Sequence, residues 1–345
     1  MTRTVPEIAT IACYGAGRMG RGIGHCLAYA GYEVALIDSR TRSHEAWTAY
    51  REQAKAEVHA SLSALADIGG FEASAIGAIL ERVHLYARSE AGDALATADL
   101  VFEAVPETDE AKRDALAEID RLARETAIVA STTSTYLSTQ LAAWSGRPDR
   151  FLNAHWLNPA YLVPLVEVSP CEETDEAVLS AVNAFLEAIG KVPVTCKASP
   201  GYIVPRLQVL AMNEAARLVE EGVASAEDVD KAVRYGFGYR FSVLGLLEFI
   251  DWGGGDILFH ASRYMADATG EDRFATPPIV RENMAAGRNG LRDGQGFYDY
   301  RDREIASYRR ERMAVFLDRL KDASLHLPPS SGAGGGHTAN EEGAT

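Results

Sequence analysis

Two residues suited to proton transfer, His155 and Glu167, stand in otherwise apolar surroundings. His155 follows a strand-like run, 151–154, and Glu167 is the only charged residue of the next run, 163–168. An isolated charge inside an apolar strand is costly, so Glu167 should have a partner. Pairing with His155 would fix one imidazole tautomer and favour the protonated ring, which makes His155 a candidate general base. The residues alone leave a second interpretation open, a core histidine beside a solvated glutamate.

A glycine-rich turn at 15–20, Gly-Ala-Gly-Arg-Met-Gly, carries the second chemical signal. It follows an apolar strand-like run, 8–14, and opens a helical pattern over 19–30. In that context the first glycine permits a tight turn, the second lets the backbone approach a pyrophosphate, and the third lets the helix pack against the strand. The free amides and positive dipole of the helix N-terminus complement phosphate charge. The expected cofactor contacts of the turn are Gly15, Gly17, Arg18, Met19 and Gly20.

Asp38 ends a further strand-like run, 33–37, at the distance of about 20 residues from the glycines that dinucleotide-binding turns show. A carboxylate at this place accepts hydrogen bonds from an adenosine ribose and repels a 2′-phosphate, which favours NAD over NADP. The turn and Asp38 together predict an NAD site. An ordinary glycine-rich turn without a ligand is the alternative.

Composition and charge exclude several other classes. The chain of 345 residues has a formal net charge of −15, which argues against nucleic acid or an anionic membrane as a partner, and no apolar run approaches the length of a membrane span. The first eight residues lack the apolar segment of a secretory signal. Four scattered cysteines have no metal-ligand spacing, so we expect no metal and reduced core thiols in a cytoplasmic protein. They are Cys13, Cys26, Cys171 and Cys196.

Strand-like runs alternate with helical patterns through the first half of the chain, which predicts an α/β fold with a doubly wound, mostly parallel sheet. Two helices, 43–66 and 73–82, interrupt the alternation as an excursion over about 43–82 and are separated by a glycine pair. The other elements expected in this domain are strands at 100–105, 127–131, 151–154, 163–168 and 192–196, and helices at 109–124 and 177–189.

A turn cluster at 198–201, Ala-Ser-Pro-Gly, marks the expected boundary between a nucleotide-binding domain, 1–197, and a helical domain, 198–300. The strong apolar faces of the helical domain predict a homodimer. A charged helix is expected within 301–325, and the tail 326–345, rich in Pro, Ser and Gly, is expected to be disordered. The helices expected in the helical domain lie at 202–221, 225–235, 244–250 and 257–266.

Several motifs occur together in the order typical of one family, and over about residues 8 to 300 the chain resembles the L-3-hydroxyacyl-CoA dehydrogenases. Several ordered motifs are far more specific than any one of them. They are Gly15-x-Gly17-x-x-Gly20, Val105-Pro106-Glu107 with Lys112, Ser131-Thr132-Thr133-Ser134, His155-x-x-Asn158-Pro159, Glu167, Pro200-Gly201-Tyr202 and Gly294-Gln295-Gly296-Phe297-Tyr298.

The resemblance implies a Rossmann-like domain, a helical dimerising domain, and an active site in the cleft between them. It also implies NAD-dependent interconversion of a 3-hydroxy acyl group and its 3-keto form, as in fatty acid metabolism, with a small-molecule substrate. His155 would be the catalytic base and Glu167 its orienting partner. For Lys112, which the resemblance places at the cofactor site, the residue alone leaves one alternative, a solvated lysine on the surface of a helix. The resemblance places four more residues at the cofactor site: Ser134, which also contacts the substrate hydroxyl, Asn158, Glu107 and Lys112.

Pro205 is the first departure from the family pattern, because it stands where the family has an active-site asparagine, before Arg206. Proline has neither an amide side chain nor a backbone donor, so one substrate contact is missing or supplied elsewhere. The same lack of a donor predicts that the helix containing Pro205 begins at about residue 204.

The second departure concerns the substrate's far end. In acyl-CoA members the helical excursion carries lysines that help to hold CoA, whereas 61–74 contains Asp67 and Glu72 and no Lys or Arg. An acidic surface repels the CoA phosphates, and Arg240 could instead grip a free carboxylate. The favoured substrate is a short 3-hydroxyacyl-CoA, and the alternative is a free 3-hydroxy acid or related carboxylate alcohol. A non-catalytic NAD-binding protein is a third, less favoured interpretation.

Overall fold

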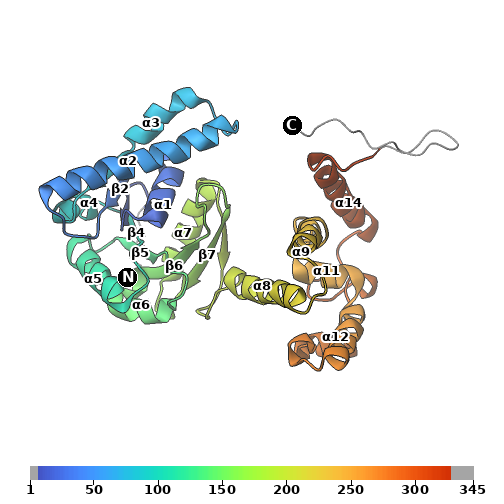
Figure 1. Ribbon diagram of the computed structural model, residues 1–345. Helices are drawn as coiled ribbons and strands as arrows, with labels where there is room; N and C mark the ends of the chain where they lie inside the picture. Colours follow the sequence, from blue (N-terminus) through green and yellow to red (C-terminus); the bar gives the residue numbers. More distant parts are fainter. Residues whose placement is uncertain (1–6, 328–345) are drawn as a thin grey trace. The chain divides into compact units, whose positions relative to one another are not determined.

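The computed structural model describes residues 7–327 and consists of two compact units, divided between Met212 and Asn213 (Figure 1). The expected disordered tail falls almost wholly on 328–345, which lie outside the described residues. Most of the N-terminal stretch judged to lack a secretory signal, 1–6, lies outside them as well. No helix within 7–327 combines the length and apolarity needed to cross a bilayer.

The first unit is built on an eight-stranded sheet with the order β3-β2-β1-β4-β5-β6-β7-β8. Neighbouring strands are parallel except for β6 and β7, which are antiparallel. The predicted mostly parallel, doubly wound α/β sheet is therefore confirmed. The strands are β1 (Ile11–Tyr14), β2 (Val34–Ile37), β3 (Val83–Tyr86), β4 (Leu100–Glu103), β5 (Ile128–Ser131), β6 (Phe151–Trp156), β7 (Leu165–Pro170) and β8 (Val192–Thr195).

Helices cover both faces of this sheet and enclose two separate cores. Consecutive residues of β1 alternate between them, since Ile11 and Cys13 belong to one core and Ala12 and Tyr14 to the other, as the two-residue period of a strand requires. One face is covered by α1 (Arg18–Tyr29), α2 (His44–Asp67), α3 (Ile76–Glu81) and α7 (Glu176–Ala188). The other face is covered by α4 (Ala91–Leu95), α5 (Asp109–Leu122) and α6 (Ser138–Ser145).

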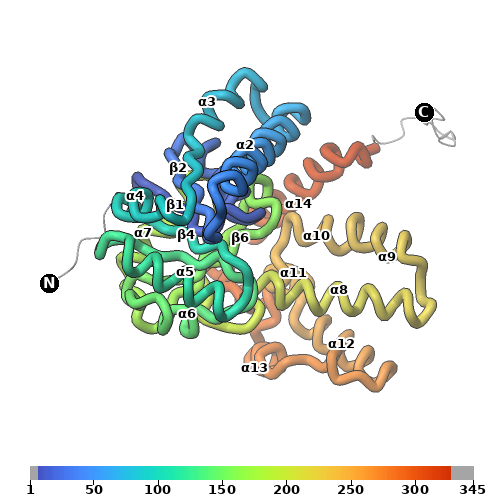
Figure 2. Tube along the Cα trace, turned by 60° about the vertical axis from the view of Figure 1, so that its left-hand side comes forward, coloured from blue at the N-terminus to red at the C-terminus, as the bar shows by residue number. Residues whose placement is uncertain are grey.

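The predicted helical excursion is present as α2 and α3, which lie side by side above the sheet (Figure 2). Ser43 caps α2 by accepting a hydrogen bond from the amide of Ala46 at 3.2 Å. After α3 the chain returns to the sheet as β3, a strand missing from the prediction. This strand has four residues at the sheet edge, and its His84 is exposed, so it lacks the continuous apolar run that marks the inner strands.

The junction between the units lies in α8 (Val204–Glu220). This helix begins at Val204, as predicted from Pro205, which occupies the first turn, where amide donors have no partner within the helix. The Tyr202 hydroxyl donates to the carbonyl oxygen of Thr133 at 2.9 Å. The first unit includes residues 198–212, which lie beyond the expected boundary at 197/198.

Within its described residues, 213–327, the second unit consists of helices and turns with isolated bridges at Gln295. The helix expected at 225–235 begins as predicted, and Ser225 caps it by accepting a hydrogen bond from the amide of Asp228 at 3.1 Å. A buried carboxylate, Asp251, accepts bonds from the amides of Phe297 and Tyr298, both at 2.9 Å. The helices are α9 (Ala226–Ala232), a π-helical turn (Val233–Gly238), α10 (Tyr239–Phe241), α11 (Leu246–Gly253), α12 (Gly255–Thr269), α13 (Pro278–Ala285) and α14 (Ile305–Asp322).

Candidate active site

A pocket of about 440 Å³ lies within the first unit, at the carboxyl ends of the central strands, the place where ligands bind in open α/β sheets. The glycine turn follows β1, the segment 104–107 follows β4, and 132–134 follows β5. Residues far apart in the sequence therefore meet around one space. The predicted site residues that line it are Gly17, Arg18, Met19, Glu107, Ser134, His155 and Asn158.

The three glycines of the turn fit the roles that a dinucleotide cradle assigns to them. Gly15 has φ +113°, and a Cβ there would lie 2.5 Å from the carbonyl oxygen of Ala104. A Cβ on Gly20 would lie 2.0 Å from the carbonyl oxygen of Gly15. Neither position therefore has room for a side chain larger than the hydrogen of glycine. Gly17 is exposed and faces no atom within 4 Å, which leaves the N-terminus of α1 open to a phosphate.

Asp38 follows β2 at the same edge of the sheet and is buried. It accepts a hydrogen bond from the amide of Arg40 at 3.2 Å and forms an ion pair with the guanidinium of Arg42. Its position agrees with that of a ribose-binding carboxylate. The pairing with Arg42 was not predicted, and it offsets the negative charge on which the sequence argument against a 2′-phosphate depends.

His155 and Glu167 stand directly opposite each other on the antiparallel strands β6 and β7. The structure brings them together as the sequence predicts: His155 Nδ1 lies 2.8 Å from Glu167 Oε2, and the Glu167 side chain is fully buried. An ionised carboxylate accepts a proton from Nδ1. The other ring nitrogen, Nε2, is left to exchange a proton with a substrate in the pocket that His155 lines.

The second oxygen of Glu167 is used as well. Oε1 accepts hydrogen bonds from the amides of Ile203 and Val204, both at 2.8 Å, so the carboxylate also caps the start of α8. The Tyr202 ring stacks on the His155 imidazole with 4.9 Å between centroids and 6° between planes. Glu167 thus holds the imidazole at its edge and Tyr202 holds it on one face. The sequence analysis did not predict the contact of Tyr202.

Ser134 is held at the pocket by Glu107. Glu107 Oε1 accepts from the Ser134 amide at 2.7 Å and from its hydroxyl at 3.2 Å, and Oε2 accepts from the Thr133 hydroxyl at 2.7 Å. Burial alone would raise the pKa of Glu107, but the nearby Lys112 ammonium and these hydrogen bonds lower it below its ordinary value. Glu107 therefore stays ionised and fixes the loop that presents Ser134.

Sequence comparisons agree with this arrangement. The family model described as "3-hydroxyacyl-CoA dehydrogenase, NAD binding domain" matches residues 10–199, and the model of the C-terminal domain matches 201–300. The chain belongs to the 3-hydroxyacyl-CoA dehydrogenase family. It is therefore an NAD-dependent oxidoreductase acting on CH–OH groups.

Three relatives illustrate the family's range. A probable 3-hydroxybutyryl-CoA dehydrogenase of Deinococcus radiodurans is 32% identical over 286 residues, covering 83% of this chain and 98% of that protein. A 5-formyl-3-hydroxy-2-methylpyridine 4-carboxylate 5-dehydrogenase of Mesorhizobium japonicum is also 32% identical, over 307 residues, covering 88% and 95%. The crystal structure of a 3-hydroxyacyl-CoA dehydrogenase from Archaeoglobus fulgidus, 30% identical, gives a TM-score of 0.71 and covers 92% of this chain and all of that one.

Lys112, a motif position of the dehydrogenase family, lies in neither of the situations considered from the sequence. It is neither solvated nor open to the pocket, because its side chain is 1% exposed and Nζ lies 3.0 Å from each oxygen of Glu103. Glu103 also accepts from the Ser131 hydroxyl at 2.6 Å and the Val105 amide at 2.8 Å. Lys112 thus acts beneath the site, with Nζ 3.7 Å from Glu107. The sequence analysis assigned neither Glu103 nor Ser131 to the site.

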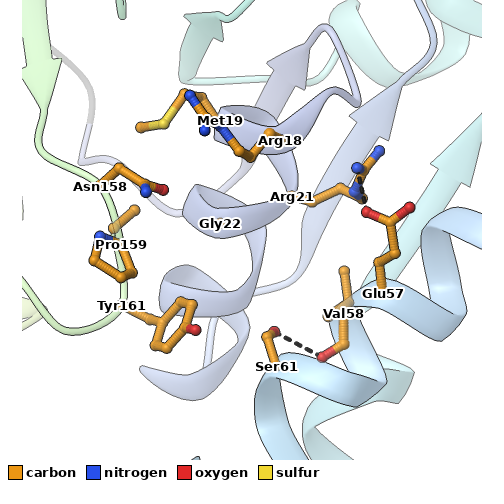
Figure 3. A pocket seen from close by; sticks show the side chains of 11 residues that line it. Arg18, Met19, Arg21, Gly22, Glu57, Val58, Ser61, Asn158, Pro159 and Tyr161 are labelled. Carbon is orange, nitrogen blue, oxygen red and sulfur yellow. Dashed lines mark hydrogen bonds and ion pairs between the residues drawn. The ribbon is translucent and has the colours of Figure 1, made fainter. Parts of the chain in front are cut away.

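A second pocket of about 240 Å³ adjoins the first, since Arg18, Met19 and Asn158 line both. Figure 3 shows its lining residues on both sides of α1. Pro159 and Tyr161 lie on one side, and the α2 residues Glu57 and Ser61 lie on the other. Two arginines line it. Arg18 is exposed, whereas Arg21 forms an ion pair with Glu57 and donates to the Ala16 carbonyl oxygen at 2.7 Å. A space therefore connects the site residues of this family member to the helical excursion.

Arg206, which follows Pro205, and Arg240, the arginine expected to grip a carboxylate, lie on α8 and in the second unit. Arg206 is exposed on α8. Arg240 lies in α10, with its guanidinium carbon 5.6 Å from the centre of the Phe249 ring. The pocket around His155 in the first unit is lined by a different arginine, Arg18.

Proposed function

We propose that the chain interconverts a short 3-hydroxyacyl-CoA and its 3-keto form, with His155 as the general base. The carrying observation is that His155, which is paired with Glu167, lines one pocket together with Gly17 of the glycine turn. In oxidation, His155 Nε2 takes the proton of the substrate hydroxyl while Glu167 stabilises the resulting imidazolium. In reduction, the imidazolium returns that proton to the carbonyl oxygen.

Several residues of the pocket position the reacting groups. Ser134 contacts the substrate oxygen, and Asn158 lies at the nicotinamide side. Gly17 and the first amides of α1 hold the pyrophosphate, and Asp38 accepts bonds from the adenosine ribose. When bound, NAD supplies the acceptor for the hydride that leaves C3. The cofactor contacts in this proposal are Gly15, Gly17, Arg18, Met19, Gly20, Asp38, Glu107, Ser134 and Asn158, with Lys112 supporting Glu107 from below.

The pocket that runs from Asn158 to α2 favours a CoA thioester over a free acid. It leads away from His155 and offers Arg18 to a phosphate. The neutralisation of Arg21 by Glu57 and the loss of an amide at Pro205 favour the second candidate, a free 3-hydroxy acid or related carboxylate alcohol. A relative is named for such a pyridine carboxylate substrate.

We further propose that residues 198–300 form a substrate and dimerisation domain and that the protein is a cytoplasmic homodimer. Large apolar side chains remain exposed on the helices of this region, including Leu210 at 63%, Met212 at 68% and Tyr264 at 71%. Apolar surface of this extent is typical of subunit interfaces. The cysteines are free thiols, three of them buried, which fits a reducing compartment. Sedimentation velocity measures the expected two-chain mass.

The substrate assignment is tested by NADH formation with a panel of 3-hydroxyacyl-CoAs and the matching free hydroxy acids. We expect kcat/KM for a short acyl-CoA to exceed that for its free acid. The reverse order would establish the second candidate. Binding of NAD by calorimetry without turnover on any member would contradict catalysis and support a non-catalytic NAD-binding protein.

A further inference from the structure

A pocket of about 470 Å³ lies beyond Asp38, between the loops that follow β2 and β3 and the helix α5. Four of its lining residues are arginines, and a single carboxylate, Glu118, lines it with them. This concentration of positive charge stands out in a chain with a formal net charge of −15. We call it the arginine pocket. Its arginines are Arg40, Arg42, Arg88 and Arg121.

The four arginines differ in how far their charges are already used. Arg88 is held by Asp114 at 2.8 Å and by Glu118, and it donates to the Ser39 carbonyl oxygen at 3.1 Å. Arg40 and Arg121 are exposed, and neither has an ion pair or side-chain hydrogen bond with another residue of the described range 7–327. Two guanidinium groups are thus available to a ligand.

Arg42 changes the electrostatics of the adenosine end of the cofactor site. It pairs with Asp38, and its guanidinium carbon lies 3.9 Å from the centre of the Tyr50 ring, which holds the side chain in place. A bare carboxylate after the second strand repels a 2′-phosphate, whereas an arginine there accommodates one. This chain has both groups, in contact with each other.

We propose that the arginine pocket binds the 2′-phosphate of a dinucleotide, so that the enzyme takes NADP(H) as well as NAD(H). The proposal rests on the proposed placement of the adenosine ribose at Asp38. Arg40 and Arg42 belong to the loop that begins at that carboxylate, which places both beside the ribose 2′ position. Guanidinium groups bind phosphates through paired, charge-assisted hydrogen bonds.

A phosphomonoester on an adenosine ribose also occurs at the 3′ position of CoA, so the test separates the two isomers. Isothermal titration calorimetry at fixed ionic strength compares 2′,5′-ADP, 3′,5′-ADP and 5′-AMP. We expect 2′,5′-ADP to bind at least about tenfold more tightly than 5′-AMP. We expect 3′,5′-ADP to show a smaller gain.

Two variants and a matched control assign the effect to the pocket. Arg40→Gln and Arg42→Gln should each reduce the affinity ratio of 2′,5′-ADP to 5′-AMP several-fold, and Arg42→Gln more strongly because it exposes the charge of Asp38. Arg51→Gln removes the same charge from an α2 side chain that is 49% exposed and lies outside the arginine pocket, so its ratio should be unchanged. The ratio of kcat/KM for NADP to that for NAD should follow the same order.

Several results would overturn the proposal. They are a 2′,5′-ADP affinity no greater than that of 5′-AMP, a preference for 3′,5′-ADP, or an equal loss in Arg51→Gln. If NAD and 5′-AMP bind while the 2′-phosphate adds nothing, this inference alone fails. If neither NAD nor 5′-AMP binds, the cofactor site of the proposed function fails with it.

Discussion

Two carboxylates of the same sheet, Glu103 on β4 and Glu167 on β7, are both fully buried and yet differ in what they can do. Each has a basic partner and backbone amides. Glu103 meets the ammonium of Lys112 at 3.0 Å, and Glu167 meets the imidazole of His155 at 2.8 Å. Lysine keeps its proton near neutral pH, whereas histidine exchanges one readily.

The comparison shows that burial and charge do not by themselves mark the reacting centre. Lys112 is enclosed beneath the pocket, and its ammonium is held by the Glu103 carboxylate. His155 lines the pocket and has one ring nitrogen beyond its carboxylate partner. The first pair lies beneath the pocket, and the second is the one that we propose for proton transfer. Four substitutions test that division, from the largest expected effect to the smallest.

Replacing the base should have the largest effect. We expect His155→Gln to lower kcat by up to about 10⁴-fold, with NAD affinity by calorimetry unchanged. His84→Gln is the matched control, because His84 also faces a carboxylate, Glu33 at 2.6 Å, but on the surface. Turnover in His155→Gln equal to that of the control would exclude His155 as the base.

Altering the partner of the base should come next. Glu167→Gln keeps an oxygen for the α8 amides but removes the charge that holds the Nδ1 proton. We expect kcat to fall by about 10³-fold, because the neutral amide no longer stabilises an imidazolium. Steady-state kinetics give kcat, and circular dichroism checks folding. A variant with full kcat would show that the pair is only structural.

Breaking the pair beneath the pocket should affect stability instead. We expect Lys112→Met to lower the free energy of unfolding by about 3–5 kcal/mol, because it leaves the buried Glu103 charge without its cation. Urea unfolding measures the loss. Lys231→Met removes a partner of the exposed Glu227, 2.8 Å away, and should leave the midpoint unchanged. Equal midpoints in both variants would show that the Glu103 pair adds no stability.

His25 is a buried histidine without a carboxylate, and it sharpens the contrast with His155. Its Nδ1 lies 2.7 Å from the Ser61 hydroxyl, and its ring stacks on Tyr161 with 4.3 Å between centroids. Burial, helped by the charge of Lys191, lowers the pKa of His25 to about 4. The unfolded chain takes up this proton near pH 6.5, so stability is fully present above that pH and falls towards pH 4.

The expected loss over this pH range is on the order of 3 kcal/mol, and His25→Phe should remove it. Urea unfolding of the parent protein and of His25→Phe at pH 7, 5 and 4 separates the contribution of His25 from that of the acidic residues. The same pH dependence in the two proteins would contradict a neutral His25 in the folded state.

Apart from the glycine turn, Asp38 and the positions implied by the resemblance, a site residue could be predicted where it stands out from its own segment. Glu167 did so as the only charge in an apolar strand. Glu103 meets the same criterion, since it is the only charged residue of the expected strand 100–105, but the sequence analysis did not apply the criterion there. The location of Lys112 depends on Glu103 and Ser131, which come from two strands. Helical periodicity cannot specify such a contact, because it says which face is buried and not what lies opposite.

The fold was more predictable than the site. The inner strands have continuous apolar runs, and the Ser-x-x-Asp signal at Ser225 marked a helix start. The prediction missed β3, α4 and α6, which are short, and it also missed α13. Elements of this length are stabilised mainly by tertiary packing, so their own sequences carry a weak signal.

The two bonds from α8 to Glu167 have a consequence for how the chain can be divided. The family's two sequence models meet at residues 199 and 201, whereas the compact unit extends to Met212. A fragment ending at residue 200 would keep every residue that lines the pocket around His155. It would also lose the amides of Ile203 and Val204 and the ring of Tyr202. The smallest piece that retains all the contacts of the proposed base therefore extends at least to Val204, where the helix that leads into the second unit begins.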